Sequence, residues 1–318
     1  MAGLNIRMFG QVSLQRDGQP LPGLSAKALE LLCYLLLNRG RGHTRESLAC
    51  TLWPETPEPV SKKYLRQAIW QLHSALVGPV PRGDPESGTL LALRPGWVRI
   101  NPQAGWWLDV AVFEQAYDLC RDTRGTDLTD TQAQALEAAV VLYRGDLIET
   151  WYQDWCLYER DRLQQTYLAM LEQMMGHCEA RGRFATGIAY GQSILRYDPA
   201  RESTHRNLMR LHYLAGNRTT ALRQYERCTS ALAKHFSLQP SHETEVLSHQ
   251  IRTDGVTSPS GPATSAAPGG DLLGGVHARL DSIQASLAAL HQQIQQEMAV
   301  ISQLTGRDVR DIAAADSR

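Results

Sequence analysis

The sequence predicts a mainly α-helical protein of 318 residues that begins with a small α+β domain. The first hundred residues alternate short strand patterns with three helical patterns, residues 106–252 are almost entirely helical in period, and a heptad follows residue 271. The length itself favours more than one domain. The expected division is 1–103 (an N-terminal domain), 104–252 (a helical domain), 253–271 (a linker), 272–305 (a coiled coil) and 306–318 (a tail).

Charge is distributed unevenly along the chain. Residues 1–100 hold 12 Lys and Arg against 7 Asp and Glu, whereas the remaining residues have more acids than bases. A basic domain on an otherwise acidic protein indicates a polyanionic partner for that domain. The chain has no uninterrupted apolar run of transmembrane length and no signal-peptide pattern at its start, so we expect a cytoplasmic protein without membrane contact. The six Cys form no C-x-x-C pair and are expected to be reduced, buried thiols.

The elements of the N-terminal domain are predicted from the alternation of apolar and polar residues, from helix-capping residues and from turn sequences. Ser25 and Thr44 are in position to cap the first two helices, and Asp17-Gly18 and Arg94-Pro95-Gly96 are turn sequences. The order is typical of a winged helix-turn-helix, which places one helix in a DNA groove. Strands are predicted at 4–9, 11–16 and 21–24, helices at 25–38, 44–53 and 60–77, and a hairpin at 89–93 and 97–100.

The third helix separates a core face from a polar face. Its apolar face consists of Leu65, Ile69, Leu72 and Leu76 at helical spacing. Long cationic and amide side chains on the other face could reach phosphates and base edges, although the same pattern also fits an ordinary solvated face. This second face carries Lys63, Arg66, Gln67, Trp70 and Ser74, with Lys62 beside them; Arg39, Arg41 and Arg45 lie ahead of the second helix, and Arg94 and Arg99 lie in the hairpin.

Residues 106–252 resemble stacked helix pairs. Gly182 and Gly216 are 34 residues apart, which is the tetratricopeptide period, and the sequences around them align as helix–turn–helix units. Stacked pairs offer a binding surface without built-in catalysis. Helices are expected at 109–122, 132–149, 157–181, 184–196, 202–214 and 218–236.

The C-terminal segment predicts self-association. Residues 253–271 are rich in Gly, Pro, Ser and Ala, as in a flexible linker, and apolar residues then recur with heptad spacing. We expect a homo-oligomer, with packing on the rest of the chain, on another protein or on a membrane surface as alternatives. The expected seam consists of Leu273, Val276, Leu280, Ile283, Leu287, Leu290, Ile294, Ile301 and Leu304, interrupted by Glu297.

Catalytic and metal-binding motifs are missing from the sequence. It has no phosphate-binding G-x-x-x-x-G-K-[ST] and no G-x-S-x-G, and the pair His205 and His212 lacks further ligands nearby. Asp154, Glu159 and Asp161 alternate with arginines and are interpreted as surface charges. We therefore expect neither an enzyme nor a cofactor or metal site.

These motifs together resemble the bacterial transcriptional activators that join an OmpR-type winged helix to a bacterial transcriptional activator domain, the architecture of the SARP regulators. The resemblance covers about residues 4–252 and depends on the order and spacing of its motifs. They are IRMFG at 6–10, DG at 17–18, AKALELLCYLLLNRG at 26–40, TRESLACTLWPE at 44–55, SKKYLRQAIWQLHSAL at 61–76, WLDVAVFEQA at 107–116, LYRGDLIE at 142–149, DWCLYERDRLQQTYL at 154–168, DPARESTHRNLMRLHYLAGNRTTALRQYER at 198–227 and LQPSHET at 238–244.

The resemblance implies sequence-specific binding of double-stranded DNA and recruitment of RNA polymerase. It implies that Lys62, Lys63 and Arg66, with Gln67 and Trp70, read the major groove, and that the hairpin with Arg94 and Arg99 is the wing. The loop at 53–59 lies where such proteins can touch polymerase. The family often has Arg where His73 stands, which would weaken a phosphate contact. The alternative function is a helical-repeat adaptor that binds proteins and no DNA.

Overall fold

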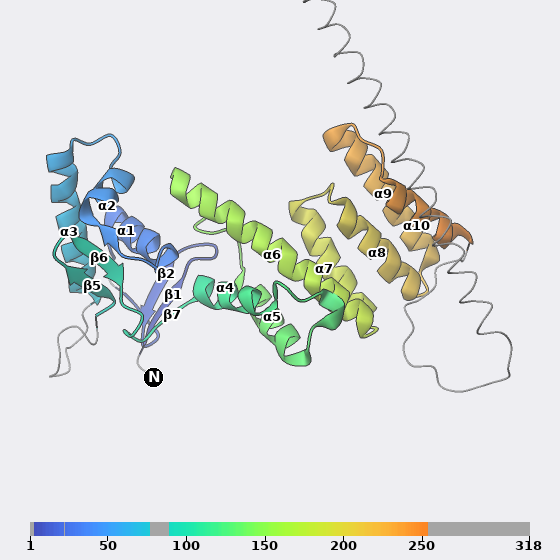
Figure 1. Cartoon of the computed structure of the whole chain (residues 1–318), viewed down its shortest axis with the longest axis horizontal. Helices are drawn as coiled ribbons and strands as arrows, with labels where there is room; N and C mark the ends of the chain where they lie inside the picture. Colours follow the sequence, from blue (N-terminus) through green and yellow to red (C-terminus); the bar gives the residue numbers. More distant parts are fainter. Residues whose placement is uncertain (1–2, 22, 77–88, 254–318) are drawn as a thin grey trace, which may run out of the picture. The chain divides into compact units, whose positions relative to one another are not determined.

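The computed structural model describes residues 3–21, 23–76 and 89–253 (Figure 1). The predicted coiled coil at 272–305, the tail at 306–318, the linker apart from Thr253, and all nine seam residues lie outside the described residues. The elements in chain order are β1 Leu4–Arg7, β2 Ser13–Arg16, β3 Gln19–Pro20, α1 Ala26–Leu37, β4 His43–Thr44, α2 Arg45–Leu52, α3 Glu58–Leu76, β5 Leu91–Arg94, β6 Trp97–Ile100, β7 Trp106–Leu108, α4 Asp109–Cys120, the 3-10 turn η1 Gly125–Asp127, α5 Asp130–Leu142, α6 Asp154–Ala180, α7 Phe184–Tyr197, α8 Glu202–Leu214, α9 Arg218–Phe236 and α10 His242–Thr253.

The first sheet has the strand order β3-β2-β1-β7. The strands predicted at 4–9 and 11–16 are present as β1 and β2, which pair antiparallel, but the described residues of the strand predicted at 21–24 form no strand. Asp17 and Gly18 both have positive φ, so they form a two-residue hairpin turn and pairing resumes at once, with Gln19 opposite Arg16. β7 was not predicted, because it pairs parallel with β1 after a separation of about one hundred residues.

The helices of the N-terminal domain begin where their caps predict. The Ser25 side chain accepts a hydrogen bond from the Ala28 N–H, and the Thr44 side chain accepts one from the Ser47 N–H. α3 begins at Glu58, two residues earlier than expected, because Pro59 fits in its first turn. The N–H groups of the first turn have no partner within the helix, so a proline there costs no helical hydrogen bond. The predicted core face of α3 is buried.

The wing is a three-stranded sheet in the order β4-β6-β5. The predicted hairpin is present, with a Pro95-Gly96 turn between β5 and β6. His43 and Thr44 add a short third strand to β6 through pairing with Val98 and Trp97. β4 was missed because two residues carry no detectable alternation, so only their distant partner strand defines them.

The helical domain keeps most of the predicted helices. The helix predicted over 132–149 is wrong beyond Leu142, and α10 was missed. α6 packs on α7, α7 on α8, α8 on α9, and α10 on both α8 and α9 (Figure 1). Gly182 and Gly216 lie just after α6 and α8 with positive φ, so the two units separated by 34 residues turn in the same way.

Residues 146–149 leave the helical pattern because they pair with the N-terminal domain. The Gly10 N–H donates to Asp146 O over 2.9 Å, and the Ile148 N–H donates to Met8 O over 3.0 Å. Ile148 has a φ of 44°, which is strained for a β-branched residue, yet Arg160 also holds its carbonyl at 2.6 Å. Backbone pairing to a distant segment thus overrides the local preference for helix.

A buried carboxylate joins the start of α4 to β1. Asp109 is 2% exposed and accepts hydrogen bonds from the N–H groups of Met8 and Phe9 at 2.8–3.0 Å, and from Val110 at 2.8 Å. Burial raises the pKa of Asp109, while these backbone donors oppose the rise. The ring of Trp155 in α6 packs edge-on against Tyr34 in α1, so these two aromatic side chains lie where the two domains meet.

Candidate DNA-binding surface

The outer face of α3 is the centre of the candidate surface. Lys63, Arg66, Gln67 and Trp70 are all exposed, while Leu65, Ala68 and Ile69 between them are buried. The helical period therefore holds the polar side chains away from the core and beside one another. Among the described residues, neither Lys63 nor Arg66 has an ion-pair partner.

Lys62 differs from its neighbour Lys63. Its ammonium group lies 2.7 Å from a Glu58 oxygen and 3.4 Å from a Glu46 oxygen. The hydrogen bond to Glu58 is the main reason that the pKa of Lys62 is raised. Lys62 therefore ties the start of α3 to α2, and its charge is largely offset by two carboxylates.

Arg45 connects α2 to the wing. Its backbone N–H donates to Gly96 O over 3.0 Å, so the first turn of α2 is fixed to the tip of the β5–β6 hairpin. Its side chain is partly buried, and its Nε atom has no hydrogen-bond partner among the described residues. The structure thus places Arg45 between α2 and the wing.

The wing carries the two predicted arginines and an aromatic residue that was missed. Arg94 and Arg99 are exposed, and Trp97 is 51% exposed. Trp97 lies over Gly42, where an added Cβ would approach its ring to 3.3 Å. The alternation of Trp97 and Arg99 with the buried Val98 and Ile100 could have identified this residue, because alternate residues of a strand share a face.

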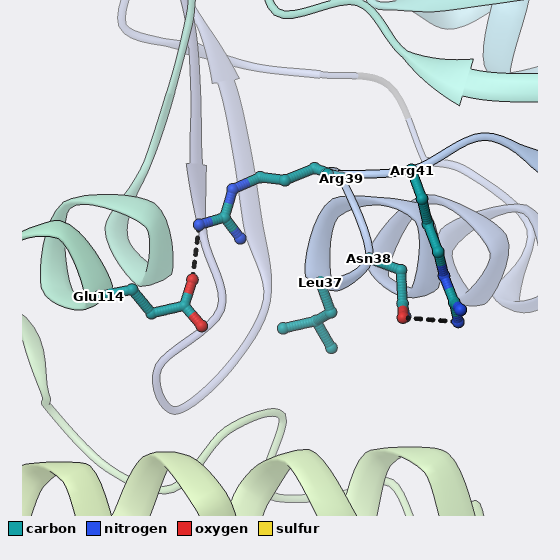
Figure 2. A pocket seen from close by; sticks show the side chains of 6 residues that line it. Leu37, Asn38, Arg39, Arg41 and Glu114 are labelled. Carbon is teal, nitrogen blue, oxygen red and sulfur yellow. Dashed lines mark hydrogen bonds and ion pairs between the residues drawn. The ribbon is translucent and has the colours of Figure 1, made fainter. Parts of the chain in front are cut away.

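Arg39 and Arg41 lie beside a shallow pocket of about 420 Å³ at the end of α1. Figure 2 shows the Arg39 guanidinium directed at Glu114 of α4, to which it donates over 2.5 Å, whereas Arg41 is directed at the Asn38 side chain. Glu114 also accepts from Arg162, which in turn pairs with Glu159. Arg39 is therefore held by the helical domain.

The described residues offer no group of His, Cys, Asp and Glu able to hold a metal ion. In the same part of the chain, no helix is long and apolar enough to cross a membrane. Both ring nitrogens of His205 have hydrogen-bond partners, Pro199 O and the Gln224 amide. Five of the six cysteines are buried, as expected, but Cys50 is exposed on α2.

Arg160 differs from the predicted surface charges around it. It donates to the backbone carbonyls of Leu147, Ile148 and Trp151 over 2.6–2.9 Å. Because Leu147 and Ile148 belong to the segment that pairs with residues 8–10, Arg160 stabilises the connection between the two domains. Arg162, in contrast, forms the expected ion pair with Glu159.

Comparison with known proteins shows what the helical domain and the fold of the chain are similar to. Residues 108–252 match the family model of the bacterial transcriptional activator domain. The transcriptional regulatory protein EmbR of Mycobacterium bovis and of Mycobacterium tuberculosis is 23% identical over 255 residues, which cover 78% of this chain and 63% of EmbR. The chain therefore spans less than two thirds of these relatives.

A second relative and a solved structure are also similar to the chain. The transcriptional regulatory protein MoaR1 of Mycobacterium tuberculosis is 22% identical over 250 residues, covering 78% of this chain and 79% of MoaR1. The structure of Mycobacterium tuberculosis EmbR in complex with a low affinity phosphopeptide superposes with a TM-score of 0.65 at 21% identity, over 80% of this chain and 66% of that one. Residues 108–252 thus match the bacterial transcriptional activator domain, and the fold of the chain is similar to that of EmbR.

Proposed function

We propose that the protein is a transcriptional regulator that binds double-stranded DNA in a sequence-specific way through α3 and the β5–β6 wing. The observation that carries the proposal is the exposed face of α3, where Lys63, Arg66 and Gln67 stand side by side without acidic partners among the described residues. Cationic side chains bind phosphates, and Arg and Gln side chains read guanine and adenine edges in the major groove. The names of the relatives support a role in transcription.

The wing is proposed to contact the groove next to the one that α3 enters. Arg94 and Arg99 are exposed on the hairpin, and the bond from the Arg45 N–H to Gly96 O holds the hairpin tip against α2. A wing fixed in this way loses little conformational freedom on binding, which favours affinity.

Contact with RNA polymerase is proposed for the loop between α2 and α3. In this loop Pro54, Glu55 and Pro57 are exposed, and Val60 and Tyr64 continue the exposed surface along α3. This part of the proposal follows the family resemblance, and activation, as opposed to repression, depends on it. Self-association through residues 273–304 likewise stays a prediction.

A pulldown of sheared genomic DNA followed by sequencing tests DNA binding. The full chain and its Lys63→Ala/Arg66→Ala variant are compared side by side. We expect the wild type to enrich one motif and the variant to lose it. Equal and unselective recovery by both proteins would contradict the proposal and favour the alternative, an adaptor whose stacked helices bind only other proteins.

A further inference from the structure

Trp70 is exposed in a way that the fold does not explain. Its side chain is 68% exposed, more than any other large hydrophobic residue described in the N-terminal domain. Its ring contacts no other aromatic ring and no cation among the described residues, unlike Trp53, which packs near Tyr64 and Lys27. An exposed indole ring does not gain the free energy that burial of its large apolar surface would provide. Its exposed position therefore favours a role in binding.

The position of Trp70 on α3 restricts what its ring can meet. Trp70 follows Arg66 by four residues and Gln67 by three, so the three side chains are neighbours along one stripe of the helix. Lys63 lies one further turn toward the N-terminus of the same stripe. If Arg66 and Gln67 face base edges, the Trp70 ring faces the next base pair in the same groove.

In the major groove the thymine C5 methyl is the apolar feature of the base edges, and the other groups there are hydrogen-bond donors and acceptors. We propose that Trp70 selects thymine by packing its ring against this methyl group. The proposal rests on the proposed function, because it requires α3 to lie in the major groove. It adds a base preference at the position that follows the bases read by Arg66 and Gln67.

The test replaces single thymines of the bound sequence by uracil, which removes only the methyl group. The bound sequence is first selected from a pool of random duplexes with the full chain, and synthetic duplexes then carry deoxyuridine at one thymine at a time. Burial of one methyl group corresponds to about a fourfold change in affinity. We expect at least one thymine where uracil weakens wild-type binding by about that factor, and no difference between the two bases for Trp70→Ala.

Two further variants separate loss of methyl recognition from loss of binding in general. Lys63→Ala should weaken binding to both duplexes yet keep their ratio, because it removes a charge and leaves the Trp70 ring in place. Trp70→Phe should retain part of the difference in affinity between the thymine and uracil duplexes. Circular dichroism checks that Trp70→Ala folds, as expected for a side chain outside the core.

Three outcomes would overturn the inference. The wild type could bind the thymine and uracil duplexes equally at every position, the selected sequence could lack thymine, or Trp70→Ala could retain the ratio. Each of these leaves DNA binding itself intact. Failure to select any sequence from the random pool would instead remove the proposed function and the thymine preference together.

Discussion

Lys62 and Lys63 are adjacent in the sequence, but the structure gives them different surroundings. Lys62 is bound by Glu46 and Glu58, whereas Lys63 has no acidic partner among the described residues. The helical period predicted that both lie near the polar face of α3. It could not reveal the contact with Glu46, which belongs to α2 and is brought close only by the packing of the two helices.

At the residue scale, Lys63→Ala should weaken DNA binding more than Lys62→Ala. One released counterion per phosphate contact gives about a fivefold loss near physiological salt for Lys63. The loss for Lys62 should stay within about twofold, because its charge already interacts with two carboxylates. Equilibrium titrations of one duplex with both variants measure the difference. Equal losses of affinity would contradict this prediction, because they would show that Lys62 exchanges its contacts with Glu46 and Glu58 for a contact with DNA.

At the element scale, the helices could be predicted from local sequence signals, but the pairings between distant segments could not. The caps at Ser25 and Thr44 were readable because they lie within three residues of the groups they bind. β4, β7 and the strand-like segment 146–149 were missed, because each is defined by a partner far away in the sequence. The helix predicted over 132–149 ends at Leu142 for the same reason, because the residues beyond it pair with a distant segment.

Close backbone contact fixes η1 against α6 and leads to a second prediction. An added Cβ at Gly125 would lie 2.3 Å from the Gln173 carbonyl oxygen, and Gly176 faces the same place. Gly125→Ala should therefore lower the free energy of unfolding by about 3 kcal/mol, since a backbone atom cannot move aside cheaply. Urea unfolding measures this value.

Gly40→Ala provides the matched control for Gly125→Ala. Gly40 has no atom within 4 Å of the added Cβ and no positive φ, so the change should stay within about 0.5 kcal/mol. Similar losses for the two variants would contradict the close contact between η1 and α6.

At the scale of the whole molecule, the N-terminal and helical domains share a core. Strand β7 lies beyond the predicted domain boundary at residue 103, yet it completes the N-terminal sheet. Asp109, Phe113 and Tyr143 of the helical domain contact Met8 and Phe9. The backbone pairing that joins the two domains depends on tertiary contacts with no local sequence signal.

A third prediction concerns Asp109. Asp109→Asn keeps the shape of the side chain but replaces one acceptor oxygen by an NH2 group that faces the N–H donors of Met8 and Phe9. Unfolding should be easier by about 2–3 kcal/mol, as for other charged hydrogen bonds lost from a buried site. The exposed residue Asp122 supplies the control, and Asp122→Asn should have almost no effect. If Asp109→Asn left the free energy of unfolding unchanged, that result would contradict the role of this carboxylate in joining the domains.

The pH dependence of stability should reflect three histidines that are buried or partly buried. Burial lowers the pKa of His43, His177 and His212, so the unfolded chain binds protons that the folded chain does not. Stability then rises with pH wherever the unfolded state holds more protons. The free energy of unfolding should be highest above about pH 7 and fall as the pH drops below the ordinary histidine pKa of about 6.5. Urea unfolding at several values between pH 8 and pH 5 tests this, and a flat or rising stability on acidification would contradict it.

The central claim is that the exposed face of α3 binds duplex DNA, and the salt dependence of binding tests it most directly. The wild type, Lys63→Ala/Arg66→Ala and a control, Arg124→Ala/Arg144→Ala, are titrated with the same duplex at several salt concentrations. Both variants lose two exposed arginine or lysine charges, but the control residues lie in the helical domain. We predict that only the α3 variant loses affinity, by about 25-fold or more, and that its log–log salt slope falls by about two. Equal affinities and slopes for the two variants would contradict the account.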